Sequence, residues 1–303
     1  MIRLLSAELL RARSRRLVKV LLILGVIGIA VGVTIGAFNS HKPPTEVVAR
    51  AVQARDSAEQ ECLSRQPSTG FTESGTPGPL RNCVVPLREF LPQDAFDVND
   101  IGNILRGTSV TLIVVGWLLG ASLAGAEWAA GTMTTLLTWE PRRLRVLFTK
   151  LIAAIATVLT LTLLIQVIFV GALWLLAATR GVNVPDAGLW RGIVGSILRV
   201  SAISSLAGLF GLAIAMITRS VTAAMASGFV YLAVVEGLIR GYKPGLAQYL
   251  IGDNAIAWIT GHPFTTSDPS NPVTLVHAVV VLSVYAVVLA SAAAVSFRTR
   301  DVT

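Results

Sequence analysis

Six long apolar segments constrain the fold of this 303-residue chain more than any other feature. A helix needs roughly 20 residues to cross about 30 Å of hydrocarbon, and each segment is long enough. Because backbone groups in lipid must be hydrogen-bonded internally, and the alternation that suits a barrel is absent, each segment is expected to be a helix. The predicted fold is an all-α polytopic membrane protein. Its six transmembrane helices are expected at residues 17–38, 106–126, 151–178, 189–217, 221–239 and 273–297.

The composition indicates the same class. Hydrophobic residues make up 53% of the chain and charged residues only 14%, whereas a soluble domain of this size would need about a quarter charged residues. The first segment follows basic residues, as in a signal peptide. Its apolar core exceeds the roughly 7–15 residues of a signal peptide, and no clear cleavage site follows. We therefore expect it to remain as the first span.

The distribution of Lys and Arg predicts the orientation in the membrane. Basic residues gather near both termini and in the 127–150 loop, which predicts that these parts are cytoplasmic in a bacterial cell membrane. Residues 1–16 place Leu5 and Leu9 on one helical face and Glu8, Arg11 and Arg15 on the other, as in an amphipathic interfacial helix. The alternative is a basic tail that only sets the topology. The net charge of +8 is explained by topology and anionic lipids, without nucleic acid.

The segment between the first two spans, residues 39–105, is expected outside the cell. Its first part, Thr45 to Leu63, has few helix breakers and is predicted to be helical. The two cysteines of the chain, Cys62 and Cys83, bracket an irregular Pro- and Gly-rich stretch. An oxidising compartment favours a disulfide between them. A redox or metal role lacks nearby histidines, so no metal site is predicted.

A second long outer connection precedes the last span. Two short apolar-polar runs, Leu246–Ile251 and Ala255–Ile259, are separated there by Gly252-Asp253-Asn254. This pattern predicts a broken outer helix of two halves at or dipping into the membrane interface. An ordinary folded loop is the alternative.

Small residues recur at close-packing spacing in the first two spans. The first span carries Gly28, Gly32 and Gly36, and the second carries Gly116 and Gly120. These glycines let helix backbones approach each other. Packing within the subunit and packing across a dimer are both consistent with the spacing.

Charged and polar side chains within the spans are costly in lipid. Arg199 is expected near the midplane of the fourth span and Glu236 in the outer half of the fifth, while Gln166 lies in the third. Each is expected to face the protein interior or a water-filled cavity, and Arg199 could pair with Glu236. A role along a transport path and a role that only fixes helix packing both remain open.

Catalytic groupings are missing from the sequence. The three histidines are isolated, and no Gly-x-x-x-x-Gly-Lys-Ser/Thr phosphate loop is present. The chain is therefore not expected to be an enzyme or to bind a cofactor. If ATP drives it, another polypeptide hydrolyses the ATP.

The 127–150 loop is the stretch most indicative of a partner. Its Gly131-Thr132 pair predicts a turn, Pro141 a helix break, and its basic residues a return to lipid headgroups. Apolar side chains among polar neighbours favour contact with a protein. The alternative is a basic loop anchored only to lipid. Residues expected in the contact are Glu127, Gly131, Thr132, Leu136, Leu137, Trp139, Pro141, Arg142 and Arg143.

These motifs resemble the permease subunits of ATP-binding-cassette (ABC) transporters of the type-2 exporter family. The resemblance rests on Glu127-x-x-x-Gly131-Thr132, Leu136-Leu137-Thr138, Pro141-Arg142-Arg143 and Lys150. The six spans, the N-terminal amphipathic helix and the broken outer helix have the same layout. The enlarged first outer loop with its cysteine pair departs from many compact members of the family.

The resemblance implies a half-transporter. Two permease copies, or one copy and a related permease, would join two cytoplasmic ABC ATPase subunits that bind ATP and Mg. The loop around Gly131–Pro141 would be the coupling helix, and the N-terminal helix the connecting helix beside it. The substrate class would be hydrophobic or amphipathic: a drug, a peptide antibiotic or a lipid-like compound.

Two other classes remain open from the sequence alone. One is an ATP-independent carrier, for which Glu236 would be the single candidate proton site. The other is a membrane anchor or sensor that uses the 39–105 loop. Co-purification of an ATPase subunit would separate both from an exporter.

Overall fold

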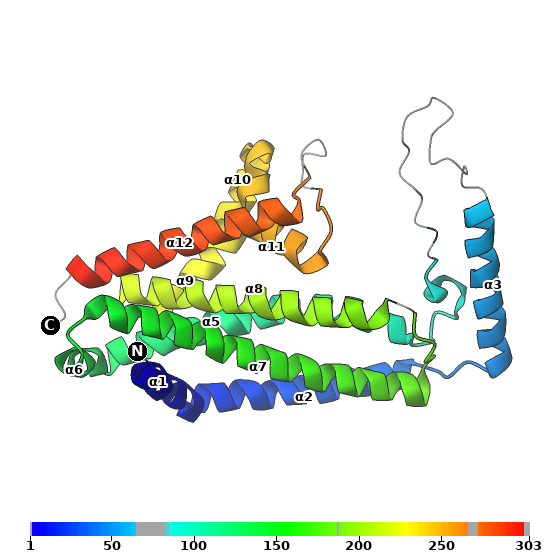
Figure 1. Ribbon diagram of the computed structural model, residues 1–303, viewed down its shortest axis with the longest axis horizontal. Helices are drawn as coiled ribbons and strands as arrows, with labels where there is room; N and C mark the ends of the chain where they lie inside the picture. The colour runs from blue at the N-terminus through cyan, green and yellow to red at the C-terminus, as the bar shows by residue number, and fades with distance from the viewer. Residues whose placement is uncertain (1, 65–82, 84, 187, 266–271, 300–303) are drawn as a thin grey trace. The chain divides into compact units, whose positions relative to one another are not determined.

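The computed structural model describes residues 2–64, 83, 85–186, 188–265 and 272–299. Within these ranges the secondary structure is helical, and extended pairing is limited to two isolated bridges, Asp97 with Val182 and Phe264 with Val273. Six helical segments are long and apolar enough to cross a membrane, which confirms the predicted all-α class and the six candidate spans. They are α2 (Arg16–Asn39), α5 (Ser109–Ala129), α7 (Arg143–Arg180), α8 (Leu189–Thr218), Val221–Tyr242 and α12 (Leu275–Thr299) (Figure 1).

The chain divides into two compact units. Unit 1 comprises Met1–Gly28, Gly102–Phe169 and Trp190–Thr303, and unit 2 comprises Ile29–Ile101 and Val170–Leu189. Helices α2 and α7 contribute residues to both.

Unit 1 carries most of the apolar helices and the short elements that connect them. The Val221–Tyr242 span consists of three pieces with a π-helix in the middle. The remaining elements of unit 1 are α1 (Ile2–Ser14), α4 (Ile101–Gly107), α6 (Thr132–Trp139), α9 (Val221–Val230), the π-helix η3 (Tyr231–Val235), α10 (Glu236–Tyr242), η4 (Pro244–Tyr249) and α11 (Ile251–Thr260).

Helix α8 packs against both α5 and α7 in unit 1. A Cβ atom on Gly116 or Gly120 of α5 would collide with backbone atoms of Ser204 or Gly208 of α8. Gly208 also lies against Val158 of α7. The predicted small-residue packing of the second span is therefore made within the subunit. Buried residues of α5, α6, α7, α8, α9 and α12 complete this core.

The glycines of α2 behave differently. A Cβ atom on Gly28 or Gly32 would meet nothing within 4 Å in the described residues, while one on Gly36 would lie 3.2 Å from Leu176 of α7. Gly28 and Gly32 therefore leave an open surface on α2.

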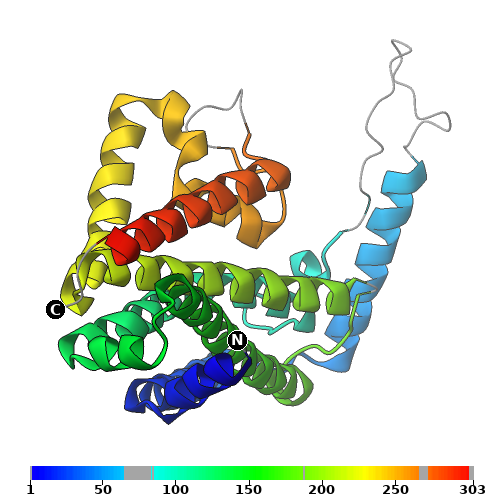
Figure 2. The same ribbon diagram turned by 60° about the vertical axis from the view of Figure 1, so that its left-hand side comes forward.

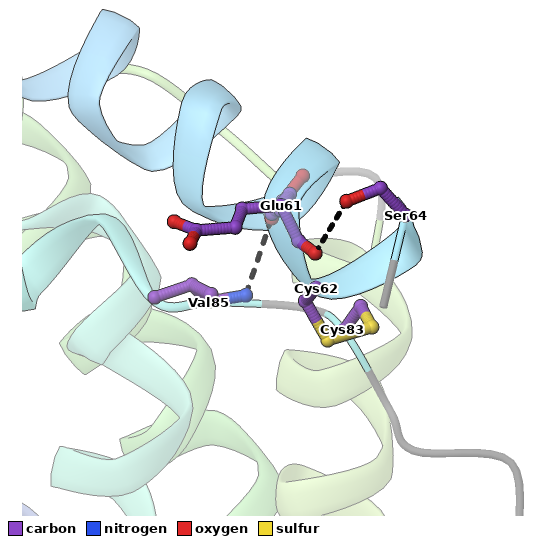
Figure 3. Close-up of a disulfide and its surroundings, with 6 residues drawn as sticks. Glu61, Cys62, Ser64, Cys83 and Val85 are labelled. Carbon is purple, nitrogen blue, oxygen red and sulfur yellow. Dashed lines mark hydrogen bonds between the residues drawn. A yellow bond between two sulfur atoms is a disulfide. The ribbon is translucent and has the colours of Figure 1, made fainter. Parts of the chain in front are cut away.

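Unit 2 is built on α3 (Thr45–Ser64), which confirms the helix predicted in that region. The 3-10 helix η1 (Leu87–Phe90) packs against α3 through a small apolar core that includes Ala51 and Leu87. A disulfide joins Cys62 to Cys83, with 5.6 Å between their Cα atoms, as predicted (Figure 3). Next to it, the Val85 amide donates to Glu59 Oε1 at 3.2 Å. The second 3-10 helix, η2, spans Val98–Asp100.

Several predicted boundaries differ from the structure. Helix α7 begins at Arg143, eight residues before the predicted start, because Val146 and Leu147 are buried in the core and extend its apolar face. The second span begins at Ser109, and residue 106 belongs to α4. The broken segment before α12 is interrupted at Leu250, not at residues 252–254, which lie inside α11.

Candidate functional site

One end of unit 1 gathers α1, the last turn of α5, α6, the first turns of α7 and the last turn of α12, and we call it the α6 end (Figure 2 brings it forward). Gly131 adopts a left-handed backbone, φ 65°, and allows the chain to reverse between α5 and α6. Helix α6 ends at Trp139, two residues before Pro141. The predicted turn at Gly131-Thr132 and the predicted helix break before Pro141 are therefore present.

A buried ion cluster lies at the α6 end. Lys150 Nζ on α7 donates to Glu8 Oε2 on α1 at 3.2 Å and to Glu127 Oε2 on α5. The residue Lys150 is only 3% exposed. Arg15 donates to Glu127 Oε1 at 2.8 Å and to the carbonyl oxygen of Ser122 at 2.9 Å. These contacts join three helices that are far apart in the sequence.

The cluster explains why a lysine is buried at the start of a long apolar helix. An isolated ammonium group would be costly there. The carboxylates of Glu8 and Glu127 contact it, and the positive charges of Lys150 and Arg15 together balance the two negative charges. Arg11 adds a contact to Glu8 at 3.2 Å from a more exposed position. Removing one central member would leave uncompensated charge in the interior. The arrangement therefore ties the position of α1 to those of α5 and α7.

Sequence reasoning identified Glu127 and Lys150 but not their partner on α1. Glu8 was assigned to the polar face of an amphipathic helix, yet it is buried together with Ala12, and Leu10 is the exposed apolar residue. The available signal was a lone acidic residue in a strongly basic N-terminal segment. The prediction that Glu8 lies on the exposed polar face of the helix was therefore wrong, because Glu8 is the residue through which α1 contacts α7.

The apolar residues of the predicted contact segment do not all face outward. Leu136 and Leu137 are partly buried against the core of unit 1, next to buried Met133. Trp139 is 85% exposed. Trp139 is therefore the apolar side chain that α6 offers most fully to a partner, whereas the two leucines also anchor α6 to the protein.

The basic residues after α6 also have contacts within the chain. Arg143 Nη1 donates to the carbonyl oxygens of Phe297 and Arg298 at the end of α12, at 3.3 and 3.4 Å. Arg142 is exposed, and Thr132 donates to the carbonyl oxygen of Glu127 at 3.4 Å. The start of α7 is thus fastened to the end of α12.

A second connection at the α6 end was not predicted. The Arg219 guanidinium lies 4.6 Å from the ring centroid of Trp128, and Trp128 meets Phe297 edge-on at 6.2 Å. Arg219 has a positive φ of 56° in the short turn between α8 and α9. These contacts join the end of α5 to the α8–α9 turn and to α12. The neighbouring Glu127-Trp128 pair is the sequence signal that pointed to this region.

The predicted Arg199–Glu236 pair is wrong. Glu236 accepts from Arg240 Nη2 at 2.9 Å and from the Gly252 amide at 2.8 Å, and the same Arg240 nitrogen donates to Asp253 Oδ1 at 2.8 Å. An arginine one helical turn away is a nearer partner than one on another span. The cluster fastens α10 to α11.

Gln166 has a structural environment. Its Nε2 donates to Ser201 Oγ at 2.7 Å and to the carbonyl oxygen of Ile197 at 3.3 Å. Its Oε1 atom is buried and has no partner among the described residues. Gln166 therefore links α7 to α8.

No cluster of three or more His, Cys, Asp or Glu side chains that could hold a metal ion occurs in the part of the chain that the structure describes. Comparisons with models of protein families, with curated proteins and with solved structures found no match.

Proposed function

We propose that this chain is the membrane-spanning permease subunit of an ATP-driven ABC exporter of the type-2 class. The observation that carries the proposal is the ion cluster of Glu8, Arg15, Glu127 and Lys150, which joins α1 to the helices on either side of α6. A short helix held in this way would transmit a displacement to the spans because its attachments are buried and multiple. The motifs that resemble the exporter family surround the same cluster.

In this proposal the α6 end lies in the cytoplasm of a bacterial cell. Helix α6 is the coupling helix, and Trp139 enters a cleft of the ATPase partner. Helix α1 is the connecting helix, with exposed Leu10 facing lipid. Two permease subunits and two ATPase subunits form the transporter, and ATP and Mg bind to the ATPase. The cargo is hydrophobic or amphipathic and leaves the cell.

The interior contacts favour this proposal over an ATP-independent carrier. A proton-coupled carrier would need a titrating group on its path, and Glu236 was the single candidate from the sequence. Glu236 is instead held by Arg240 and by the Gly252 amide. A carboxylate with those partners serves to fasten α10 to α11.

The proposal is tested by purifying the tagged full-length chain from its native membranes. We expect a phosphate-loop ATPase to co-purify in a one-to-one ratio and to hydrolyse ATP. Trp139→Ala should abolish co-purification while the protein reaches the membrane at normal levels. Trp190→Ala is the matched control, because Trp190 is also exposed but lies at the start of α8 and not on α6.

The result that would contradict the proposal is equally specific. If no ATPase accompanies the intact chain, or if Trp139→Ala retains it as fully as Trp190→Ala does, α6 is not a coupling helix. The lipid-anchored loop would then be the better interpretation of the α6 end, and the ATP-independent carrier and the anchor or sensor that uses the 39–105 loop would be the alternatives to test next.

A further inference from the structure

The basic residues near the junction of α1 and α2 fall into two groups. Arg11 and Arg15 each contact a glutamate of the α6 end. Arg16 and Lys19, in the first turn of α2, are exposed and form no ion pair with any residue that the structure describes. Helix α2 itself contains no acidic residue that could supply one. Two positive charges therefore stay unbalanced at the start of a candidate membrane-spanning helix.

The packing of α2 determines which way this turn faces. A Cβ atom on Gly25 would lie 3.0 Å from Ile165, so the Gly25 side of α2 faces α7 (Figure 1). Gly25 follows Arg16 by nine residues, which corresponds to two and a half helical turns. Arg16 therefore lies on the opposite side of α2, away from α7. Lys19 is three residues from Arg16, so the two cations are neighbours on the helix surface.

An exposed apolar strip continues from this turn along the same face. Val20, Ile23 and Ile27 follow Arg16 by four, seven and eleven residues, which is the spacing of one helical face. They are 47%, 56% and 52% exposed. Ile27 lies roughly 16 Å from Arg16 along the helix axis, which is about half of the roughly 30 Å of hydrocarbon in a bilayer. Two cations and apolar surface of one leaflet's depth therefore adjoin each other on one face.

The charge at this turn favours a lipid over a second copy of this chain as the occupant. Two copies related by a two-fold axis along the membrane normal would present the same surface to each other. Arg16 and Lys19 would then meet the same two cations of the other copy, and like charges that face each other are costly. An anionic phospholipid instead carries a negative phosphate above an apolar chain. Its charge and its apolar part match the order found on α2.

We propose that Arg16 and Lys19 bind the phosphate headgroup of an anionic phospholipid, whose acyl chain lies along Val20, Ile23 and Ile27. A guanidinium group binds phosphate oxygens through paired, charge-assisted hydrogen bonds, and an ammonium group adds a point charge. Long basic side chains near the end of a span can extend to the headgroup region. The binding requires no ATPase, so it holds or fails independently of the proposed export function.

The test adds lipid to the purified full-length protein in a neutral detergent and counts bound lipids by native mass spectrometry. Dioleoyl phosphatidylglycerol is the anionic probe, and dioleoyl phosphatidylcholine is the zwitterionic comparison. We expect the unaltered protein to prefer phosphatidylglycerol by about tenfold or more, because two cations contact its headgroup. The double variant Arg16→Gln with Lys19→Gln should lose most of this preference. It should bind phosphatidylcholine as before, which verifies that the apolar face is intact.

The matched control is Arg50→Gln, because Arg50 is an exposed arginine of α3, which is not among the candidate spans. This variant should keep the preference of the unaltered protein. If the double variant keeps the preference as well, or if Arg50→Gln loses as much of it, the lipid site on α2 is overturned. Equal binding of the two lipids by the unaltered protein would overturn the assigned ligand class.

Two further measurements identify what covers the face. Glycerol phosphate, which is the headgroup without acyl chains, should bind far more weakly than phosphatidylglycerol, and equal binding would contradict a lipid ligand. Ile23→Ala combined with Ile27→Ala should weaken binding of both lipids. It should leave the oligomeric state unchanged, which the same spectra report. A dimer of the unaltered protein that separates in this isoleucine variant would show that a second copy covers the face, and the lipid proposal would fail.

Discussion

The ammonium group of Lys150, near the start of α7, donates to the carboxylate of Glu127, near the end of α5. Because the two residues lie on either side of α6 in the chain, their contact holds the end of α5 against the start of α7. Glu8 on α1 joins the same ammonium group at 3.2 Å. Because all three side chains are buried or nearly so, their contact depends on the balance of the buried charges. It differs in this from a weak ion pair at the surface.

Replacing the lysine should therefore be strongly destabilising. Lys150→Met leaves two carboxylates without their shared cation, and we expect a loss of about 3–5 kcal/mol of unfolding free energy. Unfolding of the purified protein by denaturant in detergent micelles measures the change. The double variant Lys150→Met with Glu127→Met should lose less than the sum of the single variants, because fewer charges remain unpaired.

An exposed ion pair provides the control for this prediction. Arg145 and Glu140 lie 3.5 Å apart, and both side chains are partly exposed. Arg145→Met should cost under about 1 kcal/mol. If Lys150→Met costs no more than Arg145→Met, the buried cluster does not hold the α6 end together.

The partner of Glu236 can be tested by the same reasoning. Arg240→Leu strands Glu236 and Asp253, and we expect a clear loss of folded yield after purification. Combining Arg240→Leu with Glu236→Leu should recover part of that yield. Combining Arg199→Leu with Glu236→Leu should give additive losses, because the two side chains do not meet. If the losses were additive for Arg240 with Glu236, and yield recovered for Arg199 with Glu236, Arg199 would be the partner of Glu236 after all.

Close helix packing yields a prediction with an internal control. A methyl group at position 120 would collide with the backbone of Gly208, which cannot move aside as a side chain could. Gly120→Ala should lower the unfolding free energy by about 1–3 kcal/mol or more through overpacking. Gly32→Ala is the control, since its Cβ atom would enter open space. A denaturant midpoint for Gly120→Ala equal to that of Gly32→Ala would show that α5 and α8 are not so close.

Much of this fold is predictable because long apolar segments have few alternatives to helices. The helix of Thr45–Ser64 was predictable from its lack of breakers, and the disulfide from the expectation that both cysteines lie outside the cell. Each of these features is local in the sequence. Local patterns therefore account for the elements and for the disulfide.

Side-chain partners between distant elements were harder to predict. Glu8 meets Lys150 across 142 residues, and nothing in the local pattern of α1 indicates which carboxylate turns inward. Arg199 was paired with Glu236 because both charges are costly in lipid. That cost indicates that each charge needs a partner, but it does not indicate which residue the partner is. Arg240 was available one turn from Glu236, and proximity along the helix decided the pairing.

The partly buried leucines of α6 lead to a revised expectation. Leu136 and Leu137 pack against the core of unit 1, so replacing both with Asp would bury charge at a helix interface. We expect that double variant to reduce folded yield. Trp139→Asp should not reduce yield, because Trp139 is exposed. Quantitative immunoblotting of membrane fractions compares the variants, and equal yields for all would place the leucines at the surface.

The pH dependence of unit 2 should follow Asp97. Its Oδ1 accepts from the backbone and side-chain nitrogens of Asn99, both at 3.0 Å, whereas its buried Oδ2 has no partner among the described residues. Burial raises the pKa of Asp97 above its ordinary value of 3.8, and the nearby charge of Asp100 acts in the same direction. The folded state therefore binds the proton more tightly than the unfolded state does. Stability falls as the pH rises from about that ordinary value through the raised pKa.

Asp97→Asn removes this titration while keeping an oxygen to accept from Asn99. We expect the variant to protect the amides of residues 97–101 better than the unaltered protein does at pH 7, and the difference to shrink as the pH falls toward 4. Amide hydrogen exchange of the two proteins measures this difference in protection. The proteins are compared at the same pH each time, so that the intrinsic exchange rates nearly cancel. Asp94→Asn is the control, because the Asp94 side chain is 56% exposed. A constant difference across this pH range, or an equal gain in Asp94→Asn, would show that burial of the Asp97 charge does not limit the stability of unit 2.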